Sequence, residues 1–463
     1  MKIFFCILFS LPLLHCTPST PPQPTAKQGV LSLQADAASN RQAWDFKRDG
    51  TLTLDGEWEL YWNQLLDPID FNHNTNPKPT AIVRIPDVWK EQNINGVQTS
   101  NFGYATYRLR IRFPEKSFLQ RQLLALRVHY ELTAYRVFYN GIAVATNGNV
   151  TTDASHFQAE YRPLTVNLPT EDTDDVEIIV QVANFVHQSG GFITPIKLGL
   201  ASTLIADTRL KQLTDAFLLG ATLLMALYFI MLFLWRPVDK APLWFALSCF
   251  AIITRICVTS ERLIFVVIPN FPWDMLLRTT YVSTLVALIA AIFYVKNLLP
   301  LDTNRWVIRI ITLVSVLLAI PILFLSPLQF THIVFGVEVI TIAALSYMVF
   351  VSFLAFVRKR ENTFPLFLGF IFIVIAAMND ILYNHLQVGI GYIIPYGVLA
   401  LILMHSASLL IRLATSFRRA ELRKEDLEAE VALRTKRLSE AVHVAENAIQ
   451  EKSVFFAMMT HEL

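Results

Sequence analysis

The residues best suited to chemistry stand at the C-terminal end of the chain, where His461 is followed directly by Glu462. A neutral imidazole nitrogen is a good nucleophile near pH 7, and a neighbouring carboxylate can orient or deprotonate the other ring nitrogen. The sequence carries no Gly-rich loop, P-loop or kinase Lys/Asp set that could hold a nucleotide phosphate. The pair therefore predicts a reactive histidine in a chain that has no recognisable route to binding ATP.

A longer motif surrounds this pair and ends the chain: Lys452-Ser453-Val454-Phe455-Phe456-Ala457-Met458-Met459-Thr460-His461-Glu462-Leu463. It resembles the phosphoacceptor helix of sensor histidine kinases. The resemblance implies that His461 accepts the γ-phosphate of ATP and that Glu462 is a polar aide. ATP and magnesium would belong to a missing catalytic domain, and this chain itself would hold no cofactor. We expect residues 451–463 to be the start of a phosphoacceptor helix truncated at Leu463.

Residues 413–450 connect this motif to the apolar part of the chain. From Thr415 to Gln450 the sequence has no Gly or Pro, which predicts an uninterrupted signalling helix. The three-four spacing of a coiled-coil seam is followed by Leu427, Val431, Leu438, Ala441, Ala445 and Ala448. Arg434 and Lys452 interrupt this seam. We expect a homodimer through a weak coiled coil, with a lone solvated helix as the alternative.

The composition excludes a soluble globular protein, since the mean hydropathy is +0.43, with 54% hydrophobic and 16% charged residues. A net charge of +2 gives no reason to expect a nucleic-acid partner. The cysteines are Cys6, Cys16, Cys249 and Cys257. All lie in or beside apolar segments, so we expect neither a disulfide framework nor a metal site.

Residues 213–412 contain seven stretches long enough to cross a bilayer: 213–235, 242–260, 276–296, 306–326, 330–357, 365–386 and 391–412. The basic residues fall on alternate connections, at Arg236, Lys240, Lys296, Arg305, Arg358, Lys359, Arg360, Arg412, Arg418 and Arg419. The other loops carry only Arg262, offset by Glu261. The positive-inside rule therefore places the C-terminal tail in the cytoplasm and the N-terminal part outside. A transporter, the alternative, would show repeated halves with broken helices, which are absent.

Ionisable residues within these stretches are Arg255, Arg278, Glu338 and Asp380. With the derived orientation all four fall in the outer half of the membrane, two of each sign, and we expect an ion-paired cluster. The cluster could couple the external part to helix movement or serve as static contacts between helices. We expect His405 to be a packed histidine rather than a metal ligand, because no second histidine stands at helical spacing.

Residues 40–205 are less apolar and follow a period of two. Every odd position from Tyr107 to Phe113 is apolar and every even one is polar, which predicts a strand with one buried face. Two runs joined by Asn140-Gly141 predict a hairpin, because this pair favours the positive φ angles of a two-residue turn. Further short strands are expected at 175–182 and 195–200. The pattern predicts a single β-sandwich domain.

Three segments of this region form a recognisable pattern: Leu54-Asp55-Gly56-Glu57-Trp58-Glu59-Leu60-Tyr61-Trp62, Ile85-Pro86-Asp87-Val88-Trp89-Lys90 and Gly103-Tyr104-Ala105-Thr106-Tyr107-Arg108. They resemble the jelly-roll sensor domain of bacterial seven-transmembrane receptors with diverse intracellular signalling modules. The resemblance implies a jelly-roll sensor at 40–205 followed by seven helices. Trp44, Trp58, Trp62 and Trp89 fit either a sugar-stacking platform or the packing of a sandwich core. Carbohydrate is thus one candidate for an unknown small ligand, whose binding residues stay unknown.

Residues 1–16 read as an export signal, with Lys2 followed by a short apolar run. The segment ends in Cys16 and resembles a bacterial lipoprotein signal, which implies acylation of Cys16, although His15 departs from the small residue usual there. The alternative is a secretory signal with an incidental cysteine. Residues 17–39 are rich in Pro and Thr and are expected to form a tether.

These expectations together describe a multidomain membrane protein of the bacterial inner membrane. An all-β jelly-roll-like sandwich lies in the periplasm, a seven-helix bundle crosses the membrane, and a long helix enters the cytoplasm. We expect a two-component receptor that relays ligand binding to a histidine kinase module and thence to a response regulator if that module is complete. The alternatives are a truncated, non-catalytic receptor or scaffold that works through a partner kinase, and a non-functional fragment.

Overall fold

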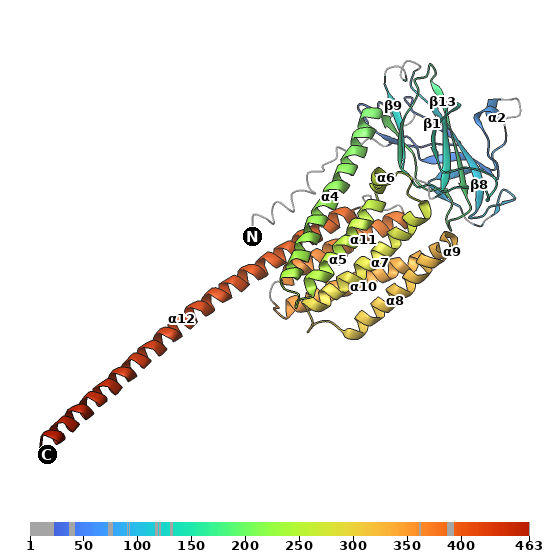
Figure 1. Cartoon of the computed structure of the whole chain (residues 1–463). Helices are drawn as coiled ribbons and strands as arrows, with labels where there is room; N and C mark the ends of the chain where they lie inside the picture. The colour runs from blue at the N-terminus through green and yellow to red at the C-terminus, as the bar shows by residue number, and fades with distance from the viewer. Residues whose placement is uncertain are drawn as a thin grey trace. The chain divides into compact units, whose positions relative to one another are not determined.

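The computed structural model describes residues 23–36, 42–72, 77–89, 91, 93–115, 119, 122–129, 133–360, 363–386 and 393–462. Strands occupy the N-terminal part of the chain and long helices follow them (Figure 1). Two compact units make up the chain, Met1–Ala344 and Leu345–Leu463, and the boundary between them lies inside helix α10 (Val334–Val357). Residues 1–16 with Cys16 lie outside the described residues.

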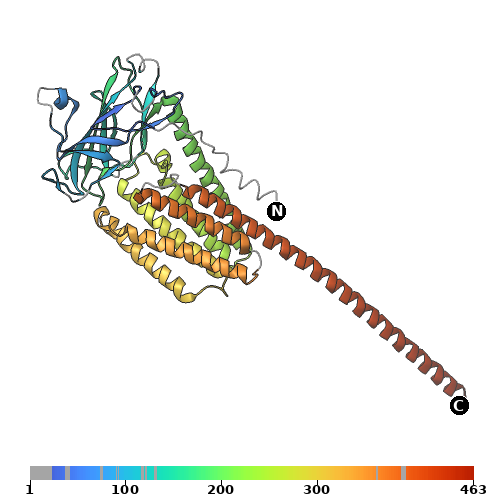
Figure 2. The ribbon, with the colours of Figure 1, turned by 180° about the vertical axis from the view of Figure 1, so that it is seen from behind.

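The strand-rich part is a sandwich of two sheets, seen from both sides in Figures 1 and 2. The larger sheet runs in the order β11 (Ile142–Asn147), β10 (Ala134–Tyr139), β13 (Asp175–Asn184), β8 (Gly103–Arg112), β3 (Gly56–Trp62) and β4 (Ala81–Ile85), with β1 (Val30–Ser32) parallel to β8. The smaller sheet runs in the order β12 (Leu164–Asn167), β9 (Leu124–Val128), β15 (Lys197–Leu200) and β2 (Leu52–Thr53). Apart from β1, the pairs in these sheets are antiparallel, so the predicted sandwich is confirmed.

Short strands complete the sandwich. β5 (Asp87–Val88) pairs with β14 (Gly191–Phe192), and β6 (Asn93–Ile94) pairs with β7 (Val97–Gln98). A short helix, α2 (Pro68–Asn72), follows β3.

The alternation expected in β8 is the alternation observed. Tyr107, Leu109 and Ile111 point into the core and are fully buried, while Arg108 and Arg110 lie on the opposite face and are half-buried. The predicted hairpin is also present: β10 and β11 are joined by Asn140 and Gly141, with φ angles of 47° and 87°. These are the left-handed values that this pair of residues adopts easily.

The sandwich begins earlier in the chain than the sequence indicated. Val30–Ser32 form β1 and pair with β8, although residues 17–39 were expected to be a tether. Leu31 and Leu33 are fully buried in the core. Burial of these side chains stabilises the strand more than the neighbouring prolines oppose it, because those prolines lie outside its ladder.

The helices of the first unit begin at the end of β15. They are α4 (Ala201–Trp235), α5 (Ala241–Val258), α6 (Ile264–Val267), α7 (Trp273–Leu298), α8 (Arg305–Phe324), α9 (Pro327–Thr331) and the first part of α10. α4 packs against α5, α5 against α7 and α7 against α8. With 35 residues, α4 is longer than the roughly 20 needed to cross a bilayer. Its N-terminal turns therefore extend outside the hydrocarbon region and pack on β9, β12 and β15.

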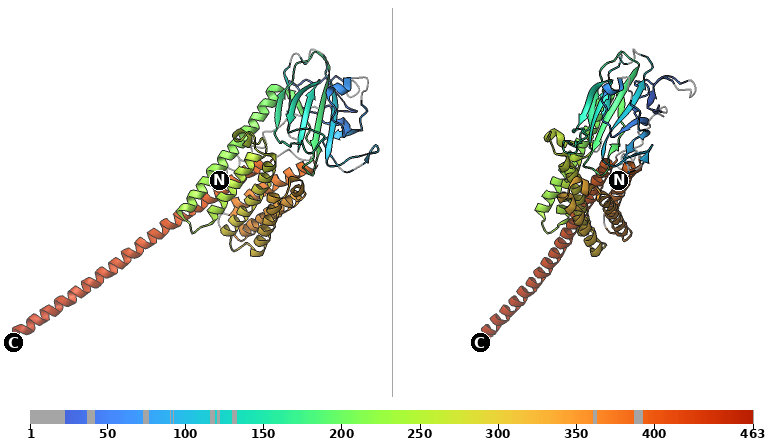
Figure 3. Two further views of the ribbon diagram at one scale, coloured as in Figure 1. Left: turned by 45° about the vertical axis from the view of Figure 1, so that its right-hand side comes forward. Right: turned by 90° about the vertical axis from the view of Figure 1, so that its right-hand side faces the viewer.

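The second unit contains the rest of α10, then α11 (Thr363–Leu386) and α12 (Ile394–Glu462). α11 packs on the N-terminal part of α12, which continues as one unbroken helix (Figures 1 and 3). Within the described residues, six helices are long and apolar enough to cross a membrane: α4, α5, α7, α8, α10 and α11. The seventh expected span, 391–412, coincides with the apolar segment Tyr396–Ser408 at the start of α12, and residues 391 and 392 lie outside the described residues.

Candidate functional site

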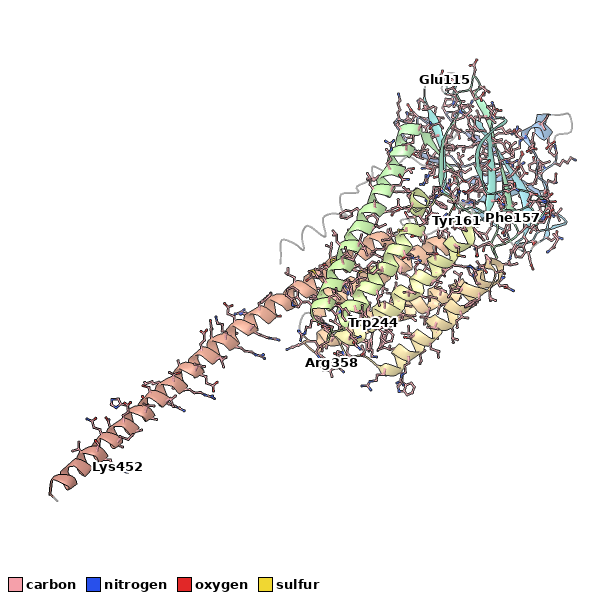
Figure 4. All side chains as sticks on the ribbon, viewed as in Figure 1. Glu115, Phe157, Tyr161, Trp244, Arg358 and Lys452 are labelled. Atoms are coloured by element: carbon pink, nitrogen blue, oxygen red, sulfur yellow. The ribbon has the colours of Figure 1, made fainter. Side chains whose placement is uncertain are left out.

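The predicted reactive histidine lies at the very end of α12. The backbone of His461 and Glu462 is helical, and their side chains lie outside the described part of the molecule. Every residue of the preceding helix from Phe417 to Val454 is exposed, as the sticks around Lys452 show (Figure 4). The roles of His461 and Glu462 stay predictions.

The four tryptophans do not form a sugar-stacking platform. Trp44, Trp58, Trp62 and Trp89 are between 0% and 4% exposed and belong to the sandwich core. The ring of Trp62 meets that of Trp89 edge-on with centroids 4.8 Å apart, and the Trp89 Nε1–H donates to the Tyr107 hydroxyl at 2.7 Å. Burying these large rings excludes more apolar surface from water than an exposed platform would.

The predicted intramembrane ion cluster is wrong for Arg278. Its Nε donates to both carboxylate oxygens of Asp274, one turn earlier in α7, at 3.0 Å, and its guanidinium also donates to the carbonyls of Ile322 and Leu325. Residues four apart are neighbours on a helix surface, so Asp274 is within reach of Arg278 without any help from tertiary packing. Arg278 thus fastens α7 to the end of α8.

The other three members of the expected cluster have different surroundings. The Arg255 Nη1 donates to the Thr280 carbonyl at 3.2 Å and to the Thr284 hydroxyl at 2.5 Å, which joins α5 to α7. Asp380, in the second unit, accepts hydrogen bonds from the backbone of Ile393 and Ile394 at 2.7 and 3.3 Å. It therefore caps the start of α12. Glu338 is half-buried in α10.

His405 is packed, as expected. It is 2% exposed, its Nδ1 lies 2.8 Å from the Leu401 carbonyl, and its ring meets Phe370 of α11 edge-on. Among the residues that the structure describes, no group of three His, Cys, Asp or Glu side chains could hold a metal ion.

A buried charge cluster lies within the larger sheet. Arg108 donates to Glu177 at 2.5 Å and lies 3.5 Å from Glu59, with its guanidinium carbon 4.4 Å above the ring of Phe71 in α2. Burial, together with the neighbouring Glu59 carboxylate, raises the pKa of Tyr61, which donates to Glu59. These groups satisfy one another, so the cluster holds α2 on the sheet.

The candidate functional site is the junction between the sandwich and the helices of the first unit. Its first part is covalent, because β15 ends at Leu200 and α4 begins at Ala201 without a linker. Ala201 and Leu204 of α4 pack on Ala125 of β9. The side chain of Thr208 lies 3.3 Å from that of Thr165 in β12. The smaller sheet and α4 are therefore joined both by the chain itself and by side-chain contacts.

The second part of the junction is a buried ion pair. The Arg127 Nη2 in β9 donates to the Glu261 Oε2 at 2.5 Å, and the two side chains are only 9% and 2% exposed. Glu261 lies in the turn that follows α5, and its backbone N–H donates to Asp215 of α4 at 3.3 Å. One carboxylate thus links the sandwich to the connection between α5 and α6.

Arg262 contacts the sandwich through a different residue. Its Nη1 donates to the Tyr161 carbonyl, and its guanidinium carbon lies 3.4 Å from the centre of the Tyr161 ring. Next along the chain, the Arg162 guanidinium donates to the Pro269 carbonyl and lies 4.8 Å from the Phe265 ring. Figure 4 labels Tyr161 beside the helices, at one end of the sandwich. Arg262 of the helical part thus contacts the sandwich, and Arg162 of the sandwich contacts the helical part.

The turn that carries Glu261 and Arg262 has an unusual backbone. Ser260 and Arg262 have φ angles of 55° and 54°, and neither is glycine. Such a conformation persists only where the surroundings hold it, and it concentrates at functional and switch regions. The contacts of Glu261 and Arg262 with the sandwich stabilise the positive φ angles of this turn.

A further contact joins the sandwich to α9, the short helix between α8 and α10. The Gln188 backbone N–H donates to the Thr331 hydroxyl of α9 at 3.4 Å. Neighbouring His187 is 6% exposed, and burial, with a smaller effect from His332, lowers its pKa. The sandwich therefore contacts the helices at separate places.

Sequence reasoning missed the residues of this junction. Glu261 and Arg262 were expected to offset one another, whereas the structure sends them to different partners, Arg127 and Tyr161. Arg127 is 134 residues away from Glu261 in the chain, and no local signal connects the two. The available hint was the presence of charges in loops otherwise nearly free of them.

Comparison with known proteins assigns a class to the helical part. Residues 211–412 match the family model described as 7TM diverse intracellular signalling. None of the curated proteins matches the chain.

Solved structures resemble a part of the chain weakly. A putative β-galactosidase from Bacteroides fragilis is 20% identical, with a TM-score of 0.24, and the match covers 32% of this chain and 22% of that one. A β-glucuronidase from Faecalibacterium prausnitzii is 14% identical over 32% and 31% of the two chains, also with a TM-score of 0.24. The match therefore spans less than a third of either enzyme, and we transfer no activity from them.

The chain thus combines a β-sandwich with a multi-pass helical part that matches the 7TM diverse intracellular signalling family over residues 211–412.

Proposed function

We propose that the protein is the receptor part of a bacterial two-component system. The sandwich lies in the periplasm and binds a small ligand, and the helices cross the inner membrane. Helix α12 delivers the change to a histidine kinase module whose phosphoacceptor helix starts with residues 451–463 and carries His461. The observation that carries the proposal is the continuity of α12, which contains both the apolar segment Tyr396–Ser408 and His461. A change at one end of an unbroken helix is transmitted as a shift or rotation along it.

The distribution of charges in the first unit supports this orientation. The sandwich joins the helices at the N-terminal end of α4, whereas Arg236 and Lys240 follow its C-terminal end. The same end of the bundle carries Lys296 and Arg305. Exposed Trp235 there is suited to a membrane interface. The basic residues at the end opposite the sandwich favour a cytoplasmic position for that end, and Trp235 favours contact with membrane lipid there.

The junction is the element through which the sandwich would act on the helices. Because β15 continues into α4 and Glu261 is bonded to Arg127, a ligand that favours one arrangement of the sandwich also favours one arrangement of α4 and α5. The tryptophans are buried, so a ligand would contact other residues of the sandwich, and carbohydrate stays one candidate.

The remaining parts of the proposal concern partners and modification. The exposed seam residues of α12 favour a homodimer, in which Leu427, Val431 and Leu438 would pack against a second copy. A response regulator would receive the phosphoryl group if a catalytic module acts with this chain. Acylation of Cys16 would add a lipid anchor to the sandwich.

The experiment supplies the catalytic part of a histidine kinase with ATP to the full chain in lipid nanodiscs. We expect acid-labile, base-stable label on His461, lost in His461→Gln and retained in His443→Gln, whose exposed histidine lies on the same helix. Glu462→Gln should slow labelling. Absence of label on the wild-type chain, with a catalytic part that labels its own phosphoacceptor, would contradict the kinase assignment.

Topology is tested separately by attaching a membrane-impermeant thiol reagent to cysteines placed at Asn140 and at His443 in cells. We expect labelling at Asn140 once the outer membrane is permeable, and at His443 only after lysis of the inner membrane. Labelling of both sites from one side would contradict the orientation.

A further inference from the structure

His129 lies on the face of the smaller sheet that is turned toward α4. Leu126 and Val128 of β9 point into the sandwich core, and Ala125 packs on α4. Side chains alternate along a strand, so Arg127 and His129 share the side of Ala125. His129 directly follows β9 and is half-buried. The histidine is therefore part of the junction, although no step of the proposed function uses it.

Positive charges predominate around this histidine. The cations that act on it come from three elements besides β9 itself: Arg127, Lys197 of β15, Lys211 of α4 and Arg262 of the turn after α5. The register places Lys197 directly opposite Arg127. Among the residues that the structure describes, the carboxylates of this region are Glu261, which is bonded to Arg127, Asp215, which accepts from the Glu261 backbone, and Asp207, which acts on Lys197.

Burial, and then the charge of Arg127, hold the pKa of His129 well below its ordinary value of 6.5. Lys211, Arg262 and Lys197 act in the same direction. We call the junction closed when the turn after α5 contacts the sandwich, as observed, and open when this contact is lost and His129 reaches water. His129 binds a proton less tightly in the closed junction than in the open one. By linkage, a fall in pH through the region below 6.5 favours the open arrangement, and a rise restores the closed one.

We propose that the junction is an acid-responsive coupling element, in which a proton on His129 adds positive charge beside Arg127 and Arg262 and releases the turn at residues 259–263 from the sandwich. The turn is poised for release because Ser260 and Arg262 are held at positive φ only by their surroundings. This inference rests on the proposed function, since it regulates the junction through which the sandwich acts on the helices. The effector is the proton itself, in the compartment that the sandwich faces.

Amide hydrogen exchange of the full chain in nanodiscs tests the inference. Peptides covering 259–268 are followed at about pH 7.5 and about pH 5.5, on either side of the ordinary histidine pKa, with correction for the intrinsic effect of pH on exchange. We expect the wild-type turn to lose protection at the lower pH by up to about tenfold, because a histidine with its ordinary pKa in the open arrangement is protonated about ten to one at pH 5.5. Peptides from β13 report whether the sandwich stays folded.

Variants separate the histidine from its surroundings. His129→Gln should keep the turn protected at both pH values, and His129→Lys should leave it unprotected at both. Glu261→Gln, which removes the bridge to Arg127, should also lose protection at both. His156→Gln, at a histidine whose side chain is 77% exposed, should respond like the wild type. If β13 shows that His129→Gln unfolds the sandwich, His129→Asn replaces it.

An unchanged wild-type turn across the two pH values would overturn the inference, and so would a His129→Gln variant that still responds as the wild type does. The exchange measurement needs no nucleotide and no kinase. A flat exchange profile therefore counts against acid coupling alone, whereas failure to label His461 counts against the proposed function alone.

Discussion

The sandwich and the distal part of α12 are stabilised by different kinds of interaction. In the sandwich, side chains as large as Trp58 and Tyr107 are 0% exposed and charged groups meet partners far away in the sequence. In α12, every residue from Phe417 to Val454 is exposed, and the ion pairs Lys424–Glu428 and Arg434–Glu430 join residues one turn apart. Tertiary packing therefore determines the first region, and helix propensity with local pairs determines the second. The exposed apolar residues of the second region are therefore available to a partner, whereas the large aromatic rings of the first are not.

The largest effect should follow from emptying the sandwich core. Trp58→Ala removes a fully buried ring that meets Phe192 edge-on with centroids 5.2 Å apart. We expect the free energy of unfolding of the sandwich to fall by about 3–5 kcal/mol, through lost burial and a remaining cavity. Denaturant unfolding followed by near-ultraviolet circular dichroism measures it.

Leu438→Ala on α12 is the matched control, since Leu438 is 68% exposed. It should leave the unfolding of the sandwich within about 0.5 kcal/mol of the wild type. Equal losses from the two substitutions would abolish the contrast between the regions.

The next effect concerns the buried ion pair of the junction. Glu261→Leu leaves Arg127 buried without its carboxylate, and we expect a loss of about 3 kcal/mol in the stability of the docked sandwich, because an unpaired buried charge is costly. Arg127→Leu combined with Glu261→Leu should recover much of this loss. A double-mutant cycle on thermal unfolding in nanodiscs measures the coupling, and additive single effects would show that the two residues act independently.

The smallest effect concerns an ion pair of α12. Arg434 donates to Glu430 at 2.6 Å, with the two side chains 76% and 54% exposed. We expect a coupling of about 0.3–0.5 kcal/mol from the corresponding cycle of alanine variants, and less at high salt, because water screens exposed charges. Circular dichroism of the helical signal near 222 nm, at about 0.1 M and about 1 M salt, measures it. A coupling as large as that of Arg127 with Glu261 would mean that α12 is buried against a partner at this point.

One ion pair of the helical part was within reach of sequence reasoning. Asp274 stands one turn before Arg278, so their pairing could have been expected from i,i+4 spacing alone. The aromatic residues of the sandwich were open to two interpretations, and only the observed burial decided for the core. The partner of Glu261 could not be predicted, because nothing in a loop indicates which strand will lie against it.

The sequence by itself determined the local features of the protein: the alternation of β8, the Asn140-Gly141 turn, the apolar spans and the unbroken helix that contains His461. These follow from periodicity and from backbone preferences, which act between neighbouring residues. The tertiary structure decided that β1 joins the sheet, that the tryptophans are buried, and that Arg127, Glu261 and Arg262 form a junction. Contacts of this kind depend on which surfaces exclude water together, and that is set only when distant segments have packed.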